Sequence, residues 1–181
     1  MRPGGADSGL AMAGISDGGA LDHAEALART LGLTPLPGEG GYFRRTWTSD
    51  AVLPGGRPAG SAILFLETSA PDGFSAFHEL DAEEVYHFHA GDPVELYALA
   101  PDGELSLTVL GPDPLSGQSP QAVVPAGFIQ APRLAPGGAW ALLGTTMAPA
   151  YEESGFRLVA REEMLARLPG QARLVESLTR G

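Results

Sequence analysis

Residues 78–91 of the chain read His78-Glu79-Leu80-Asp81-Ala82-Glu83-Glu84-Val85-Tyr86-His87-Phe88-His89-Ala90-Gly91. Three of the four histidines of the protein fall in this window, together with four carboxylates. Imidazole and carboxylate groups are the side chains that proteins use to hold borderline metals and to move protons near neutral pH. The β-prone residues on either side of the acidic turn predict two strands. This hairpin is therefore the first candidate for a functional site.

The pattern of β-prone runs and turn residues continues outward from this window over most of the chain. An aromatic run, Tyr42–Trp47, precedes it, and turns such as Pro71-Asp72-Gly73 and Pro101-Asp102-Gly103 separate the other runs. Many short strands at this spacing are typical of a sandwich, a jelly roll or a barrel, so we predict an all-β fold. The predicted strands are 61–67, 75–78, 83–90, 94–99, 105–110, 122–124, 127–133, 139–147 and 155–160.

Helices are predicted only near the two ends of the chain. Apolar residues at helical spacing predict one helix over Ala20–Leu31 and two short ones over Glu162–Leu168 and Gln171–Leu178. The segment before the first helix is rich in glycine, alanine, serine and aspartate and contains no long apolar run. We therefore interpret residues 1–19 as a flexible leader rather than a signal peptide, and residues 20–181 as a single domain.

The composition excludes several classes of function. The chain contains no cysteine and all eleven of its basic residues are arginine, which excludes disulfides, thiolate nucleophiles and lysine Schiff bases. A formal net charge of −11 argues against nucleic acid or an anionic membrane as a partner, because both need a basic surface. No apolar run approaches the roughly 20 residues of a membrane span. We expect a cytoplasmic protein.

Two short motifs resemble those of the cupin superfamily. His78, Glu84 and Gly91 match the first motif, and Pro125–Gln130 matches the second. The chain is most similar to the Cupin_5 family, also called DUF985. This resemblance implies a cupin jelly-roll (double-stranded β-helix) barrel with an N-terminal helix and short C-terminal helices, and it implies a homodimer. The segments that carry the resemblance are Glu39–Phe43, Phe77-His78, Glu83–His87, Gly91–Pro93 and Val124–Gln130.

The departures from the cupin pattern concern the metal site. A metal-binding cupin uses three histidines and one glutamate, but Leu80 and Gln130 stand where the second and third histidines are expected. His78, Glu84 and Gln130 remain as weak candidate ligands, and two strong ligands rarely hold a first-row metal firmly. We therefore expect no cofactor, and at most weak binding of a divalent metal.

The alternation of side chains along residues 83–90 assigns them to two faces. Glu84, Tyr86 and Phe88 share one face, so Tyr86 and Phe88 form an aromatic wall if Glu84 lines the barrel interior, as the resemblance implies. His87 and His89 then lie on the outer or inter-sheet face. A bulge before Gly91 is an alternative that turns one of them back.

The favoured hypothesis is an enzyme that works by proton transfer, an isomerase, epimerase or lyase, on a polar sugar-like or carbonyl metabolite. His78 is its catalytic base or acid and Glu84 its partner, within hydrogen-bond reach or across one water. The alternative is a non-catalytic cupin that binds a small molecule, and a metal-dependent oxygenase is less favoured. The residues expected to bind the substrate are Gln130, Tyr86, Phe88, Tyr42 and Arg44.

Arg44 and Arg45 follow a Gly-Gly turn at the start of the sheet. One of them can point inward and meet an anionic group with its two-pronged guanidinium. A surface salt bridge is the competing interpretation for each.

Overall fold

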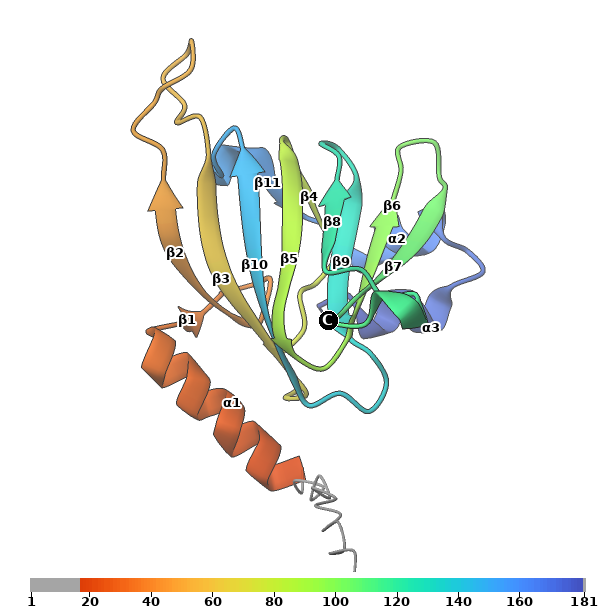
Figure 1. The fold of residues 1–181 in the computed structure, drawn as a ribbon. Coiled ribbons are helices and arrows are strands. Elements are labelled where there is room, and N and C mark those ends of the chain that lie inside the picture. The colour runs from red at the N-terminus through yellow and green to blue at the C-terminus, as the bar shows by residue number, and fades with distance from the viewer. Residues whose placement is uncertain (1–16, 181) are drawn as a thin grey trace, which may run out of the picture.

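The structure is a computed structural model, and it describes residues 17–180. Its strands form two antiparallel sheets that lie face to face (Figure 1). One sheet has the order β1-β2-β3-β10-β5-β8 and the other has the order β11-β4-β9-β6-β7. The strands of the first sheet are β1 Thr34–Pro35, β2 Tyr42–Thr48, β3 Ser61–Thr68, β5 Glu83–Gly91, β8 Gln121–Val124 and β10 Trp140–Ala148. Those of the second are β4 His78–Leu80, β6 Val94–Leu99, β7 Leu105–Leu110, β9 Ile129–Leu134 and β11 Phe156–Leu158.

The predicted all-β jelly roll is confirmed as a sandwich of two sheets. In the part of the chain that the structure describes, the two sheets are not joined into one closed barrel. Inner-face residues of both sheets, including Phe65 and Leu143 from one and Val94 and Leu96 from the other, form the core between them. These residues alternate with outward-facing ones, which is the pattern from which the strands were predicted.

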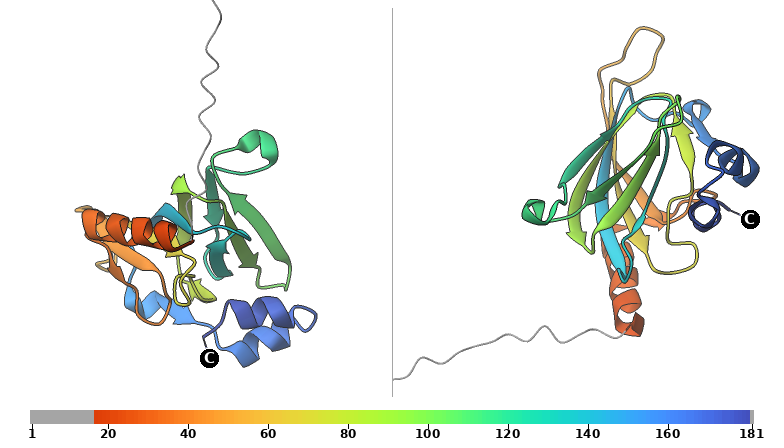
Figure 2. Two further views of the ribbon diagram at one scale, coloured as in Figure 1. Left: turned by 90° about the horizontal axis from the view of Figure 1, so that it is seen from below. Right: turned by 90° about the vertical axis from the view of Figure 1, so that its right-hand side faces the viewer.

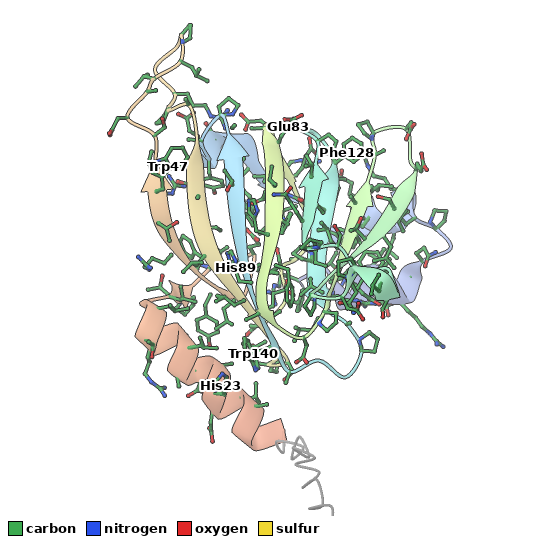
Figure 3. All side chains as sticks on the ribbon, viewed as in Figure 1. His23, Trp47, Glu83, His89, Phe128 and Trp140 are labelled. Atoms are coloured by element: carbon green, nitrogen blue, oxygen red, sulfur yellow. The ribbon has the colours of Figure 1, made fainter. Side chains whose placement is uncertain are left out.

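Helices cover the outer faces of both sheets. The first helix, α1 (Asp17–Leu31), packs Ala28 against Leu66 on the outer face of the six-stranded sheet, and His23 lies beside Trp140 with 5.1 Å between ring centroids (Figure 3). The helices α2 (Arg161–Arg167) and α3 (Ala172–Ser177) lie together against the five-stranded sheet (Figure 2). The 3₁₀ turns are η1 Pro114–Ser116 and η2 Glu153–Gly155. None of the helices among residues 17–180 has the length and apolar character needed to cross a membrane.

Two elements begin three residues away from their predicted starts, and several other boundaries differ by one or two residues. The first helix begins at Asp17 and not at Ala20, so the last residues of the expected leader are helical, whereas residues 1–16 of that leader lie outside the described residues. The added residues include Gly18 and Gly19. Each glycine costs a helix about 1 kcal/mol, a cost that a helix packed against a sheet tolerates. The strand expected at 75–78 begins instead at His78. The amides of Ala76 and Phe77 donate to carbonyls of a loop and of the C-terminal segment rather than to a neighbouring strand.

Candidate functional site

A cavity of about 140 Å³ lies between the two sheets at one end of the sandwich. Strands from both sheets contribute to it, and the loop before β2 adds a carboxylate, Glu39. Both polar and apolar side chains line the cavity. The lining residues are Leu36, Glu39, Phe43, Arg45, Ser61, Ile63, His78, Leu80, Glu84, Thr145, Met147, Tyr151 and Phe156.

His78 reaches the cavity from β4 and is only 2% exposed. Its Nδ1 lies 2.8 Å from the carbonyl oxygen of Ala76. Because a carbonyl oxygen can only accept a hydrogen bond, Nδ1 carries a proton and Nε2 is the ring nitrogen left for a ligand. The backbone thus determines the tautomer of the neutral imidazole.

Glu39 is a site residue that the sequence reasoning did not select. The hydroxyl of Ser75 donates a hydrogen bond of 2.6 Å to Glu39 Oε1, and this oxygen lies 3.9 Å from Nδ1 of His78. The carboxylate that faces His78 most directly is therefore Glu39. The sequence signal for Glu39 is its place in the Glu39–Phe43 segment, which carries part of the family resemblance.

Arg180 holds the loop that carries Glu39. Its guanidinium donates to the backbone carbonyls of Glu39 at 2.6 Å, Phe74 at 2.9 Å and Gly38 at 3.3 Å. Gly40 has a φ of 112°, and a Cβ at this position would collide with the guanidinium and with the Phe74 carbonyl. The glycine therefore allows the close approach of Arg180 to the loop.

Glu84 enters the cavity from β5 and is 7% exposed. Gln130 Nε2 donates a hydrogen bond of 2.7 Å to its Oε2. Burial raises the pKa of the Glu84 carboxyl above the ordinary value of 4.5, although the nearby His78 acts in the opposite direction. A carboxyl group with a raised pKa can exchange a proton closer to neutral pH than an ordinary glutamate can.

His78 and Glu84 line the same cavity without a hydrogen bond between them. Among the described residues, neither a hydrogen bond nor an ion pair joins them directly. The register of β4 and β9 places His78 opposite Gln130, whose side chain holds Glu84. Of the two predicted forms of the pair, the direct hydrogen bond is absent, and contact through a water or a bound ligand is the form that this geometry allows.

Comparisons with known proteins agree with this architecture. Residues 25–159 match the model of the family described as Cupin superfamily (DUF985). This chain belongs to that family. The family prediction made from the sequence is thereby confirmed, and no curated protein matches this cupin.

Solved structures resemble this cupin over most of its length. A protein from Shewanella oneidensis is 32% identical, with a TM-score of 0.80 over 87% of this chain and 97% of its own. A hypothetical protein from Leishmania major is 24% identical, with a TM-score of 0.79 over 87% of this chain and 99% of its own. A cupin 2 conserved barrel domain protein from Rhodopseudomonas palustris is 13% identical, with a TM-score of 0.56 over 82% and 90%, and shares the fold alone.

The residues at the metal positions of this cupin do not fit a first-row metal. His78 and Glu84 supply one imidazole and one carboxylate, and Leu80 lines the cavity beside them without a donor atom. Gln130 points its Nε2, a hydrogen-bond donor, at Glu84. Across residues 17–180, no three histidine, aspartate or glutamate side chains are grouped to hold a metal. This donor set is poorer than the three or four nitrogen, sulfur or oxygen ligands of stable sites.

Strand alternation explains which expected substrate-binding residues reach the cavity. On β2, Arg45 lines the cavity, whereas Tyr42 and Arg44 lie on the opposite face. Arg45 therefore takes the place of Arg44 in the candidate site. Tyr86 and Phe88 lie on the inner face of β5 as expected, but they belong to the hydrophobic core below the cavity and not to its lining.

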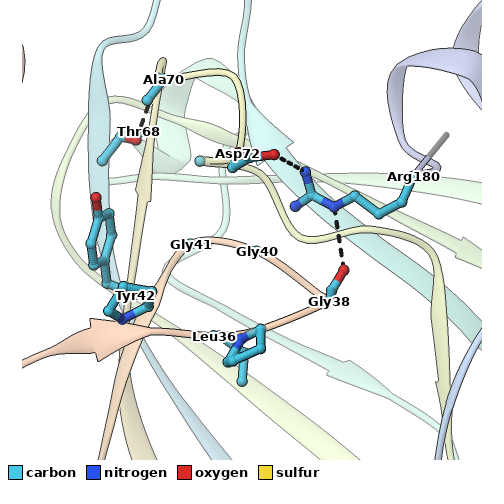
Figure 4. A pocket seen from close by; sticks show the side chains of 12 residues that line it. Leu36, Gly38, Gly40, Gly41, Tyr42, Thr68, Ala70, Asp72 and Arg180 are labelled. Carbon is cyan, nitrogen blue, oxygen red and sulfur yellow. Dashed lines mark hydrogen bonds and ion pairs between the residues drawn. The ribbon is translucent and has the colours of Figure 1, made fainter.

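Tyr42 lines a different and larger pocket, of about 390 Å³, beside Gly38, Gly40 and Gly41 of the loop before β2 (Figure 4). The polar side chains there are those of Tyr42, Thr68, Asp72 and Arg180. Its charged residues, Asp72 and Arg180, pair with each other at 2.9 Å. The titratable groups that can do chemistry together are therefore those of the inner cavity.

Glu67 on β3 is a second buried carboxyl group that the sequence did not single out. It is 0% exposed, and within the described chain no side chain forms a hydrogen bond with either of its oxygens. Burial, with a smaller contribution from the charge of Glu39, raises the pKa of Glu67 to about 8, although the backbone amide of Ser75 acts in the opposite direction. Glu67 is therefore mainly a neutral carboxylic acid at pH 7.

His87 and His89 lie on the outer face of the six-stranded sheet. Gln121 donates a 3.0 Å hydrogen bond to Nδ1 of His87, whose Nε2 lies 3.2 Å from the hydroxyl of Thr146. The pairing of β5 with β10 shifts by one residue at His89, so the bulge considered from the sequence is present. It lays the His89 ring over Gly144 on the outer face, and does not turn it inward.

Proposed function

We propose that this cupin is a small-molecule enzyme that works by proton transfer, an isomerase, epimerase or lyase, on a carbonyl or sugar-like metabolite. The observation that carries the proposal is the convergence of His78 and Glu84, from opposite sheets, on one cavity. Titratable groups in different environments that face a common space are the usual arrangement of an acid and a base.

His78 is the group suited to remove a proton from carbon. Its Nδ1 proton is held by the Ala76 carbonyl, so the lone pair of the neutral ring is on Nε2. Glu39, with its Oε1 3.9 Å from Nδ1, stabilises the imidazolium that forms. Such a step converts a carbon next to a carbonyl group into an enol or enolate.

Glu84 is the group suited to protonate the substrate oxygen. In its protonated form it donates to the carbonyl oxygen as the proton leaves the neighbouring carbon, and it becomes a carboxylate. The amide of Gln130, which we expected to bind the developing oxyanion, stabilises this carboxylate instead. His78 then returns its proton to the former carbonyl carbon. The hydroxyl group on the neighbouring carbon gives its proton to Glu84 and becomes the new carbonyl, which completes an isomerisation.

The size of the cavity limits the reacting part of the substrate. An engineered cavity of about 150 Å³ holds one benzene molecule, and this cavity measures about 140 Å³. Ordinary ligand pockets are about 300–1,000 Å³. We infer that some six non-hydrogen atoms enter, and that any larger substrate extends through the mouth of the cavity.

A binding protein without catalysis is the second candidate. Apolar side chains make up about half of the lining, among them Leu80, Met147 and Phe156, and Leu80 replaces a polar group that a metal-binding cupin has. A metal-dependent oxygenase is supported least, because the donor set does not fit the metal.

Proton exchange distinguishes the first two candidates. Hydroxy-aldehydes and hydroxy-ketones of three to six carbons would be incubated with the protein in D₂O and followed by NMR. We expect the proton on the carbon next to the carbonyl of at least one compound to exchange for deuterium, and the exchange to be lost in His78→Ala. Saturable binding without exchange would instead support the binding protein.

A further inference from the structure

Arg45 differs from the other arginines of the protein in its surroundings. It is the one arginine among the residues that line the cavity, and within residues 17–180 it forms no hydrogen bond or ion pair. Arg44, Arg161 and Arg173 also lack an ion pair, but none of them lines this cavity. The arginines that pair with a carboxylate are Arg29, Arg57, Arg133, Arg157, Arg167 and Arg180.

An arginine that lines a cavity and has no carboxylate partner is informative in this chain. The protein has 22 acidic and 11 basic residues, so a carboxylate partner for an exposed arginine is easy to supply. Arg45 is nevertheless left with all of its N–H donors free of protein acceptors. Guanidinium groups of this kind recognise carboxylate and phosphate groups through two parallel hydrogen bonds.

Tyr151 holds the guanidinium without using those donors. The Cζ of Arg45 lies 5.4 Å from the centroid of the Tyr151 ring, which is a cation–π contact. The pairing of β2 with β3 shifts directly after Arg45, between Arg45 and Trp47, and such bulges often re-aim a neighbouring side chain. The side chain is therefore positioned while its polar edge stays available.

The charged residues of the lining favour one orientation of a bound ligand. His78 and Glu84 are buried at the inner end, and Glu39 adds a carboxylate there, whereas Arg45 is exposed. The carboxylate of Glu39 at the inner end repels an anionic group, and Arg45 at the mouth attracts it. A ligand with a neutral carbonyl end and an anionic end would enter with the carbonyl end first.

We propose that Arg45 and Tyr151 form an anion subsite at the mouth of the cavity, which selects small substrates that carry a carboxylate or phosphate group. The assignment of a substrate to this subsite rests on the proposed function, but the subsite itself does not. It makes Arg45 a specificity-determining residue.

The subsite can be tested with inorganic phosphate and with acetate as probes. NMR of the arginine Nε–H groups of the whole protein would be recorded during each titration. We expect a saturable shift of the Arg45 signal, no comparable shift for Arg44, and tighter binding of whichever anion resembles the natural group. Arg45→Gln should weaken this binding at least about tenfold, while the matched variant Arg44→Gln should leave it unchanged. The absence of a saturable shift at Arg45, or equal binding by Arg45→Gln, would overturn the proposal.

Substrate preference gives a second and separate test. Matched hydroxy-carbonyl compounds with a neutral, a carboxylate or a phosphate end would be compared in the D₂O exchange assay. We expect the anionic members to exchange faster at low concentration, and Arg45→Gln to remove this preference by raising KM. Exchange that is equally fast for neutral compounds would overturn the subsite and leave the proton-transfer enzyme standing. Binding of phosphate at Arg45 without any exchange would leave the subsite standing and overturn the proton-transfer enzyme.

Discussion

His78 and Glu84 are the residues whose loss should stop turnover. We expect His78→Ala and Glu84→Gln each to lower kcat by about 10²–10⁴, the usual effect of removing a general acid or base. Deuterium exchange rates at saturating substrate would measure this. His87→Ala is the matched control, because His87 lies on the outer face of β5 and should leave kcat unchanged. A Glu84→Gln protein with full activity would contradict the assignment.

Glu67 should make the stability of the protein depend on pH. With a pKa of about 8 against an ordinary value of 4.5, the folded protein holds a proton that the unfolded chain releases. The free energy of unfolding therefore falls as pH rises between these values, by at most about 1.4 kcal/mol per pH unit. Glu67→Gln removes this term.

Urea unfolding at several pH values would measure the effect of Glu67→Gln. We expect the variant to gain stability relative to the wild type from about pH 5 to pH 8, and the difference to level off above that. Glu104→Gln, which changes an exposed carboxylate, is the control and should follow the wild type. Parallel curves for wild type and Glu67→Gln would show that Glu67 is not neutral in the folded protein.

Sequence patterns identified some of these residues and missed others for physical reasons. His78 and Glu84 were found because a strand and a family motif point to them. Glu39 was not, because its contact with His78 depends on a loop whose path is determined by Arg180. The choice between Arg44 and Arg45 depended on a strand register that composition does not determine.

Strands β4 and β9 bring together the positions that a metal-binding cupin uses. His78 pairs with Gln130 in the backbone register, and Leu80 lies two residues further along the same face. The double variant Leu80→His, Gln130→His therefore adds two imidazoles to an existing histidine and glutamate. We expect the affinity for nickel or zinc to rise about tenfold or more in calorimetry. Adding His78→Ala to the folded double variant should abolish the gain, and unchanged affinity in the double variant would mean that the four positions do not converge.

Most strands could be predicted from the sequence because alternation and turn residues are local signals. The two-residue β1 was missed, since so short a strand has no pattern of its own. The short β4 was placed three residues early, because Phe77 is β-prone but its amide, like that of Ala76, bonds to a distant segment. Elements that depend on long-range hydrogen bonds are those that sequence patterns locate least well.

The whole molecule is predicted to be a homodimer. Strand β1 pairs only with Tyr42 and Phe43, so the rest of β2 forms an open sheet edge on which Trp47 is 49% exposed. Open edges of this kind are normally covered in native proteins. We expect light scattering to give about twice the chain mass of 18.7 kDa at micromolar concentration.

Substitution at this edge tests the dimer. Trp47→Arg should shift the equilibrium toward the monomer, whereas Leu115→Arg, at a fully exposed position of η1, should leave the mass unchanged. A single-chain mass for the wild type would refute the dimer, and a dimer that survives Trp47→Arg would place its interface elsewhere.

The contacts of Arg180 bear on the stage of folding at which the cavity forms. They join segments separated by 141 residues at Glu39 and 106 at Phe74, and the amide of Phe77, next to His78, donates to the carbonyl of Leu178. Contacts this distant in sequence form late in folding, because long loops must close first.

We expect the C-terminal segment that carries Arg180 to open without the rest of the protein. If it does so as one cooperative unit, the amides of Ala76 and Phe77 should exchange with solvent hydrogen together with those of α3, and ahead of the amides in the central strands. A ligand of the cavity would then slow exchange in all of these places at once. Low denaturant concentrations should accordingly weaken ligand binding while the sheets remain folded.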